Sequence, residues 1–323
     1  MADTILHQIV RDAPDLAPAT KKVFLSDLDA WTAFAGDDPS RWTRARAQEF
    51  YSSLLSRMKS QSANRLMATL TYAASWWAKR EQNEKLNFAV IQKAPPEETE
   101  GRSALTDGQA QALLRVASRA DLPERAQLLQ RPWALRDTAL VVVGLETGMR
   151  RMSMQTMLIE KTGVHPKLGY EVTEVRLKGQ RAPARYPVPL SESAVAALTP
   201  WLQFLAQKGI EKGAVWRRLT KRVKGVEVGK GLSAQSIFDI VVKLGGEAGI
   251  EHLTPHIFRH TFISWRLAAG WTPQQVAAVT GHQLPRTLNV ANIDIGAMSH
   301  YADPKVFAPT ISTATPSWLR PRK

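Results

Sequence analysis

Hydrophobic positions recur at helical spacing through most of the first hundred residues. Apolar side chains three and four residues apart line one face of a helix, so the pattern predicts helices over 21–36, 45–58 and 62–81. Short polar breaks separate these three segments. We therefore expect residues 20–92 to form a small helical bundle.

The stretch QKAPPEETEGRS, residues 92–103, has no such periodicity and is rich in proline and acid, which is typical of a linker. Directly after it, Thr106 precedes Gln109 by three residues, the spacing of a capping box that opens a helix. The predicted organisation is a first domain over 1–95, a linker over 96–104 and a second domain over 105–323.

The second domain mixes both periodicities. A helix is predicted to begin at Pro132, because proline suits the first turn of a helix, and to run to about residue 148. Three short β-rich segments follow at 156–162, 169–178 and 185–190, as in an antiparallel meander. Helical spacing then returns in four segments, of which the last two open with Thr-Pro: 191–209, 233–249, 254–270 and 272–281. The fold class expected is mainly α, with a helical bundle followed by an α+β domain that has a small antiparallel sheet.

Composition supports two folded domains, since the chain has 323 residues, 44% of them hydrophobic, and 10 Trp. The absence of Cys excludes disulfides, thiolate metal sites and a cysteine nucleophile. The first residues are acidic where a signal peptide is basic, and no apolar run is long enough to span a bilayer. We expect a cytoplasmic protein without a membrane partner.

The net charge of +14 is unevenly distributed. Residues 1–100 have as many acids as bases, whereas residues 101–323 have 30 bases and 16 acids. Such an excess indicates a polyanionic partner, because surface cations release counterions when they meet phosphates. Solubility charge is the alternative, and composition does not choose between the two.

Five short motifs contain residues suited to an oxyanion. They are TGMRR at 147–151, the lysine of VRLKGQ at 178, TPHIFRHTF at 254–262, VTGH at 279–282 and HYADP at 300–304. Arginine and histidine near a helix start suit phosphate, because the helix N-terminus adds its own positive end. Taken singly, each motif is more often a surface pair or a packing residue.

Their order along the chain resembles the tyrosine recombinase, or phage integrase, family over essentially the whole length. The resemblance implies that the first domain is a SAM-like, core-binding DNA-binding domain and that the second is catalytic, with a C-terminal tail from about residue 304. The catalytic residues it implies are Arg150, Lys178, His256, Arg259, His282 and the nucleophile Tyr301.

The implied reaction cleaves and rejoins DNA through a 3′-phosphotyrosyl intermediate, as in DNA integration by phages and other mobile elements. Two guanidiniums would stabilise the charge on the phosphate, with His256 as base and Lys178 as acid. The covalent link conserves the phosphoester, so no cofactor, ATP or metal is expected. Arg151 is the less favoured alternative to Arg150, and His260 is expected to be structural.

Two positions depart from the family pattern. Ser153 stands where members usually have a glutamate, which we interpret as the loss of a structural support. The separation of 19 positions between His282 and Tyr301 is longer than usual and suggests an extended loop.

Basic residues in both domains are expected to contact the DNA backbone, which gives affinity and not sequence choice. They are Arg41, Arg44, Arg46, Arg57, Lys59, Arg65, Lys79, Arg80, Arg217, Arg218, Lys221, Arg222 and Lys224. For the run 216–224, a solvated hairpin or helix face is the alternative.

The expected partner is double-stranded DNA with a specific recombination site, on which the protein would act as a homotetramer on synapsed DNA. The resemblance also allows accessory DNA-bending proteins, and a tail passed to a neighbouring subunit. Three alternatives stay open from sequence: a type IB topoisomerase, a non-catalytic DNA-binding relic of a recombinase, and a metal-dependent nuclease. The last would need clustered carboxylates, whereas the acids here are scattered.

Overall fold

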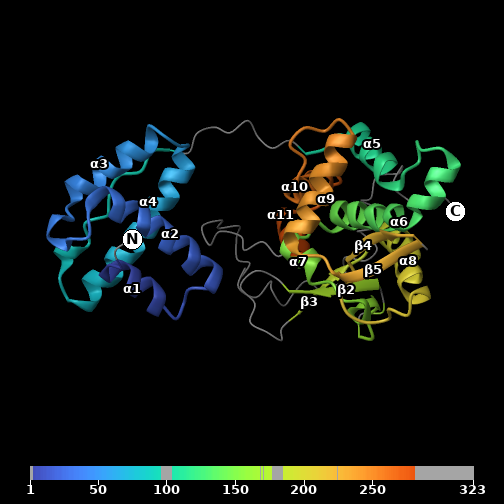
Figure 1. Ribbon diagram of the computed structural model, residues 1–323, viewed down its shortest axis with the longest axis horizontal. Coiled ribbons are helices and arrows are strands. Elements are labelled where there is room, and N and C mark those ends of the chain that lie inside the picture. Colours follow the sequence, from blue (N-terminus) through green and yellow to red (C-terminus); the bar gives the residue numbers. More distant parts are fainter. Residues whose placement is uncertain are drawn as a thin grey trace. The chain divides into compact units, whose positions relative to one another are not determined.

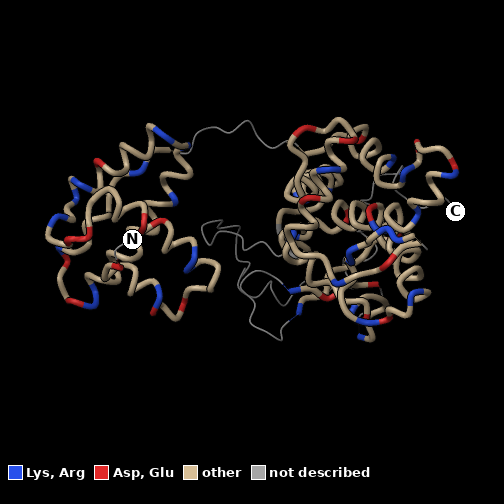
Figure 2. The backbone as a smooth tube through the Cα atoms, viewed as in Figure 1, with Lys and Arg blue, Asp and Glu red and all other residues tan. Residues whose placement is uncertain are grey.

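The computed structural model divides the chain into two compact units, Met1–Gly101 and Arg102–Lys323 (Figure 1). The residues that it describes are 3–95, 104–167, 169, 171–176, 185–223 and 225–280. Lys and Arg residues are spread along the backbone of both units (Figure 2). None of the helices in these ranges is long and apolar enough to cross a membrane.

The first unit is a helical bundle. Its elements are α1 (Ile5–Asp12), α2 (Pro18–Ala35), α3 (Arg44–Leu55) and α4 (Ser60–Arg80), with 3-10 turns at Pro39–Arg41 and Glu84–Leu86. Helices α2, α3 and α4 confirm the three predicted segments. Helix α1 was not predicted because it has only 8 residues, yet Leu6, Ile9 and Val10 are buried at helical spacing and Thr4 forms a capping box with His7.

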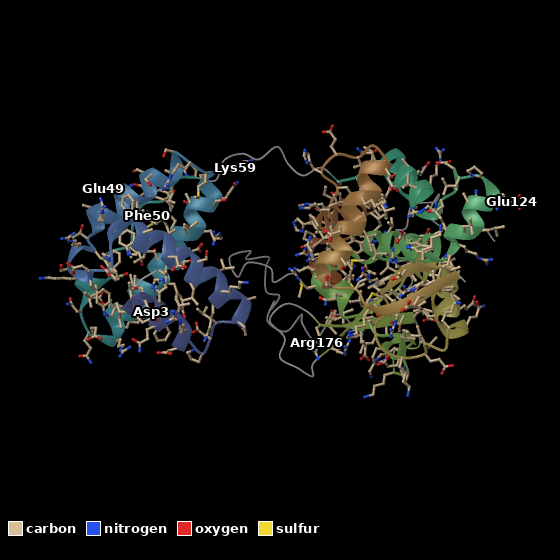
Figure 3. All side chains as sticks on the ribbon, in the orientation of Figure 1. Asp3, Glu49, Phe50, Lys59, Glu124 and Arg176 are labelled. Carbon is tan, nitrogen blue, oxygen red and sulfur yellow. The ribbon has the colours of Figure 1, made fainter. Side chains whose placement is uncertain are left out.

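Aromatic rings form the centre of this bundle. The Trp31 ring lies 5.3 Å from that of Phe50 and 5.5 Å from that of Phe88, centroid to centroid. Trp42 packs edge-on against Trp31 at 6.3 Å. In Figure 3, Phe50 points into the interior while its neighbour Glu49 projects from the surface. Such rings bury large apolar areas and give a small unit a real core.

The second unit contains seven of the described helices. They are α5 (Asp107–Ser118), α6 (Glu124–Thr147), α7 (Arg151–Gln155), α8 (Glu192–Gln207), α9 (Ala234–Glu247), α10 (Pro255–Ala268) and α11 (Pro273–Thr280). The capping box predicted at Thr106 and Gln109 is present at the start of α5. Thr272 also accepts a capping hydrogen bond, from the Gln275 amide, whereas the Thr254 hydroxyl makes no such bond.

The predicted start of α6 at Pro132 is wrong. The helix begins eight residues earlier, where the Pro123 carbonyl accepts the amides of Ala126 and Gln127, and Pro132 lies inside it. Proline inside a helix leaves the carbonyl four residues before it without its usual donor. That residue is Leu128, which is exposed, so water can take the place of the missing N–H.

The predicted antiparallel meander is confirmed, with its first strand shifted. Strands β1 (Thr162–Val164), β2 (Glu171–Val175) and β3 (Tyr186–Pro189) pair in sequence order. The part of 156–162 before Thr162 is not in β1, because Ile159–Lys161 forms a 3-10 turn and the backbone of residues 157–159 bonds to that of Gly213 and Val215.

A separate hairpin pairs β4 (Arg217–Arg222) with β5 (Gly225–Gly231), so residues 217–222 of the basic run form a strand and not a helix face. Helices α5 and α8 pack on α6, and α10 packs on α6 and α9. The mainly α fold with small antiparallel sheets is confirmed.

Candidate active site

The C-terminal end of α6 positions Arg150. Helix α6 ends at Thr147, whose hydroxyl donates to the Val143 carbonyl at 2.6 Å, and Gly148 reverses the chain in the left-handed conformation at φ 56°. Arg150 then caps the start of α7 and is half-buried. The TGMR sequence is thus a helix end followed by a tight turn, which holds the backbone of Arg150 beside α6.

Helix α10 approaches this turn closely, because two glycines face two of its phenylalanines. A β-carbon added at Gly144 would lie 2.5 Å from the Phe258 ring, and one added at Gly148 would lie 2.7 Å from the Phe262 ring. No side chain larger than hydrogen fits at either position without a shift of α10. The close contact brings the backbone of α10 to the turn that precedes Arg150.

Arg259 crosses this contact. It is buried, with 2% of its surface exposed, and its Nη1 donates to the Gly148 carbonyl at 2.9 Å. Burial, together with the positive charge of Arg150, lowers the pKa of Arg259 to about 9. The guanidiniums of Arg150 and Arg259 are therefore close enough to repel each other. Two like charges near each other on a partly buried surface are an arrangement that a bound anion would stabilise.

His256 lies in the first turn of α10 and is exposed. Its ring packs edge-to-face against that of His260, with centroids 4.6 Å apart and an interplanar angle of 87°. The start of a helix is positive, so His256 and Arg259 both lie in the part of α10 that favours an anion.

Arg151 has a different contact from its neighbour. Its guanidinium lies over the Phe238 ring of α9, 5.4 Å from the centroid. A cation held on an aromatic face has a packing role. This contact supports the choice of Arg150 over Arg151 as the phosphate-binding arginine.

The sequence did not point to a polar cluster that joins α7 to the meander. The Ser153 hydroxyl donates to the Arg176 carbonyl at 2.9 Å, and the Thr156 hydroxyl accepts the Arg176 amide at 2.9 Å. Arg185 donates to the carbonyls of Thr156 and Glu174. Figure 3 labels Arg176, which directly follows β2. Ser153 thus still acts as a structural support, although it is shorter than glutamate.

Four of the predicted site residues lie outside the described residues. They are Lys178, His282, Tyr301 and Lys224.

The predicted DNA-contacting residues of the first unit are mostly exposed. Arg41, Arg44, Arg57, Lys59, Arg65, Lys79 and Arg80 are all in this class. Arg65 also binds the buried Asp27. Arg46 is only half-exposed, because it bonds to Glu49 and to the Phe34 carbonyl and lies over the Phe34 ring. Its contacts give Arg46 a structural role.

On the hairpin, Arg218, Lys221 and Arg222 are exposed. Arg217 differs, since its three guanidinium nitrogens donate to the carbonyls of Ala214, Gly229 and Lys212. Arg217 therefore holds the base of the hairpin together, and Arg218 and Lys221 are the better candidates for phosphate contacts.

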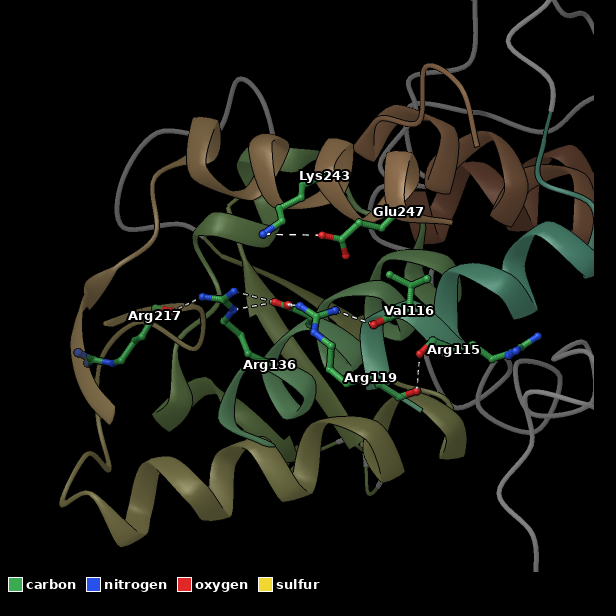
Figure 4. Close-up of polar contacts among 9 residues, drawn as sticks. Arg115, Val116, Arg119, Arg136, Arg217, Lys243 and Glu247 are labelled. Atoms are coloured by element: carbon green, nitrogen blue, oxygen red, sulfur yellow. Dashed lines mark hydrogen bonds and ion pairs between the residues drawn. The ribbon is translucent and has the colours of Figure 1, made fainter. Parts of the chain in front are cut away.

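A largely buried ionic network connects this hairpin to α6 and to the end of α5. Asp137 lies between Arg136 and Arg119, each 2.8 Å from one of its carboxylate oxygens. Arg136 then donates to the Arg217 carbonyl at 3.3 Å. Figure 4 shows the chain of contacts from β4 through α6 to the end of α5. Among the described residues, no group of three or more His, Asp or Glu side chains could hold a metal ion.

Curated proteins that are similar to this chain include tyrosine recombinases named XerC. A tyrosine recombinase XerC of Roseiflexus castenholzii is 26% identical over 224 residues, 65% of each chain. Another XerC, of Actinobacillus pleuropneumoniae, is 29% identical over 208 residues, 63% of this chain and 58% of the relative. The chain thus matches less than two thirds of the length of these relatives.

Solved structures share the fold at low sequence identity. A lambda integrase dimer bound to a COC′ core site has a TM-score of 0.61 at 15% identity and covers 90% of this chain and 96% of that one. The XerH site-specific recombinase bound to a difH substrate has a TM-score of 0.59 at 16% identity, covering 92% and 82%. The model of the phage integrase family matches residues 104–290, more than half of the chain, and the protein belongs to that family.

Proposed function

We propose that the protein is a site-specific DNA recombinase that cleaves and rejoins strands through a 3′-phosphotyrosyl intermediate. The observation that carries the proposal is the pair of neighbouring guanidiniums, Arg150 on the turn after α6 and Arg259 on α10. The similar proteins are recombinases by name, and two of the solved structures have bound DNA.

The arginine pair suits a phosphodiester at the moment of attack. Negative charge then builds on the two non-bridging oxygens, and guanidiniums stabilise it through paired hydrogen bonds. In the free protein, burial and, to a smaller extent, repulsion by the charge of Arg150 lower the pKa of Arg259. A phosphate bound between the two guanidiniums offsets that repulsion. Because the protein already holds them in place, little further ordering is needed on binding.

Tyr301 is the nucleophile in this proposal. Its hydroxyl oxygen bonds to phosphorus while its proton passes to His256, because a phenol with an ordinary pKa of about 10 needs a base. The bond from phosphorus to the 5′-oxygen breaks, and Lys178 protonates the leaving oxygen. His282 donates to the phosphate. The reverse steps rejoin the strand with no ATP or metal, since one phosphoester replaces another.

The first unit serves as the core-binding domain and the second as the catalytic domain, joined by the linker. Exposed bases on both provide the phosphate contacts. One similar structure is a lambda integrase tetramer bound to a Holliday junction, with a TM-score of 0.59 at 16% identity and coverage of 90% and 76%. By analogy, this proposal has the protein act as a homotetramer on two duplexes, in the cytoplasm and on a specific site.

Covalent trapping tests the proposal. Wild-type protein is incubated with sheared DNA of its source genome, denatured with detergent in the presence of a chelator, and the attached DNA is sequenced. We expect adducts at one repeated site, absent in Tyr301→Phe and Arg150→Ala and present in the matched control Arg151→Ala. DNA binding without any adduct contradicts catalysis and favours the relic. Adducts that persist in Tyr301→Phe place the nucleophile elsewhere.

A further inference from the structure

Glu146 and Arg266 form an ion pair with both side chains wholly buried. The Arg266 Nη2 lies 2.9 Å from the Glu146 Oε2, and neither side chain has any exposed surface. Glu146 is in the last turn of α6 and Arg266 in the last turn of α10. The Arg266 guanidinium also lies over the rings of Phe262 and Trp271, 4.8 and 5.6 Å from their centroids.

Stability alone is a poor explanation for such a pair. Both ions lose their hydration, and apolar residues of similar volume commonly replace a buried ion pair with no loss of stability. The pair has one property that apolar contacts lack. Its energy changes steeply when either partner moves, because the low dielectric strengthens the attraction and because the N–H···O hydrogen bond depends on distance and angle. A buried ion pair therefore favours one register of two helices over its neighbours.

The register concerned is that of the two arginine-bearing elements. Glu146 is two residues before Gly148, which accepts the hydrogen bond of Arg259, and four before Arg150. Arg266 follows Arg259 by seven residues, about two helical turns, and so lies on the same side of α10.

Phe262 connects the two ends of this contact. Its ring packs against Gly148 and also lies under the Arg266 guanidinium. A slide or rotation of α10 on α6 breaks the ion pair, moves Phe262 off Gly148 and separates Arg259 from its carbonyl acceptor at the same time.

We propose that Glu146 and Arg266 are positioning residues that fix the register of α10 against the end of α6, and thereby the spacing of Arg150 and Arg259. The proposal rests on the proposed function, in that the spacing serves phosphate binding. Neither residue contacts DNA.

The test removes both charges together. The double variant Glu146→Gln with Arg266→Met keeps similar volumes and leaves no unpaired buried ion. We expect it to fold with a melting temperature at or above that of the wild type and to bind the trapped DNA site within twofold of the wild-type affinity. Single-turnover cleavage falls at least tenfold, and stabilisation by inorganic phosphate is lost. Wild-type cleavage and phosphate response in a folded double variant overturn the proposal.

A conservative variant decides the matter if the double variant does not fold. Arg266→Lys keeps a cation opposite Glu146 but loses the planar guanidinium that stacks on two rings. Cleavage reduced about threefold or more at unchanged DNA affinity supports positioning, and cleavage at the wild-type rate overturns it. The phosphate response needs only Arg150 and Arg259. It therefore tests the positioning proposal even if the wild type forms no Tyr301 adduct, which is the failure of the proposed function.

Discussion

The Arg259 guanidinium donates to the carbonyl of Gly148, two residues before Arg150 in the chain. One turn of backbone therefore carries one arginine and anchors the other. The hydrogen bond takes up one N–H of Arg259 and fixes the plane of the guanidinium. Any displacement of this turn moves both cations, so the geometry of the anion site depends on the end of α6 more than on flexible side chains.

Inorganic phosphate is expected to stabilise the second unit. A ligand that binds only the folded state raises the free energy of unfolding, by about 1.4 kcal/mol when it is present at ten times its dissociation constant. Differential scanning fluorimetry with phosphate or chloride at matched ionic strength measures the effect. We expect Arg150→Ala to abolish the rise in melting temperature that phosphate causes, and the matched variant Arg151→Ala to keep it. Equal rises in both variants refute Arg150 and Arg259 as the anion site.

The phosphate shift depends on pH. The pKa of Arg259 is lowered to about 9, so its charge is lost as the pH rises through that value. Anion binding falls over the same range. For the free protein the sign is opposite: above about pH 9 the unfolded state still binds the proton that the folded state has lost, so the free energy of unfolding increases as the pH rises. Arg150→Lys is the control. It keeps a positive charge beside Arg259, so phosphate binding should still fall as the pH rises through the pKa of Arg259.

Gly148→Ala is expected to destabilise the second unit strongly. Alanine in the left-handed conformation costs about 1–2 kcal/mol, and its β-carbon would lie 2.7 Å from the Phe262 ring, adding roughly 1–3 kcal/mol of overpacking. Gly249→Ala is the control, because Gly249 has φ 69° with no atom within 4 Å of the added carbon. Chemical denaturation compares the two, and equal losses contradict a close approach at Gly148.

Asp137→Asn leaves the buried Arg136 and the half-buried Arg119 without their counter-charge and should cost about 3–5 kcal/mol. Asp121→Asn removes the exposed partner of Arg115 at the same end of α5 and should cost less than about 1 kcal/mol. Urea unfolding of both variants measures the difference. A small loss in Asp137→Asn refutes the network as a support for the hairpin.

The hairpin separates a DNA contact from a structural one. Replacing Arg218 and Lys221 with alanine should weaken DNA binding and reduce the slope of log K against log salt by up to about 2, since about one counterion is released for each phosphate contact. Arg217→Ala should lower the melting temperature, because three carbonyls lose their donor. An unchanged salt slope in the double variant argues against phosphate contacts by β4.

Local signals in the sequence predicted much of this fold. Apolar spacing located most of the helices, and the Thr106 capping box located the start of α5. The start of α6 was missed because proline suits the first turn of a helix and Pro132 was taken for that position. The structure shows why Pro132 is tolerated inside the helix: Leu128, whose carbonyl lacks its usual donor, is exposed to water. Helix α1 was missed because eight residues hold barely two turns of pattern.

In the candidate site, too, the residues in local motifs were predicted, and those that depend on distant partners were not. Arg150 and Arg259 follow from motif order, whereas Arg185, Glu146 and Arg266 do not, since a charged residue in a sequence is ordinarily on the surface. Their burial depends on partners distant in the chain: Arg266 lies 120 residues from Glu146. Equally, nothing in the run of bases distinguished Arg217, which donates to three backbone carbonyls at the base of the hairpin, from its exposed neighbour Arg218.

Pro132 has a further consequence for how α6 opens. The helix has an exposed first part, with Leu128 and Leu129 on its surface, and a last part in which residues 139–147 are all buried. With one N–H missing at the junction, the first two turns can unwind in solvent without breaking the cooperative ladder behind them. Amide hydrogens before Pro132 should exchange with deuterium orders of magnitude faster than those of residues 139–147. We expect the amide hydrogens of residues 139–147, which precede the turn to Arg150, to exchange only when the whole unit unfolds.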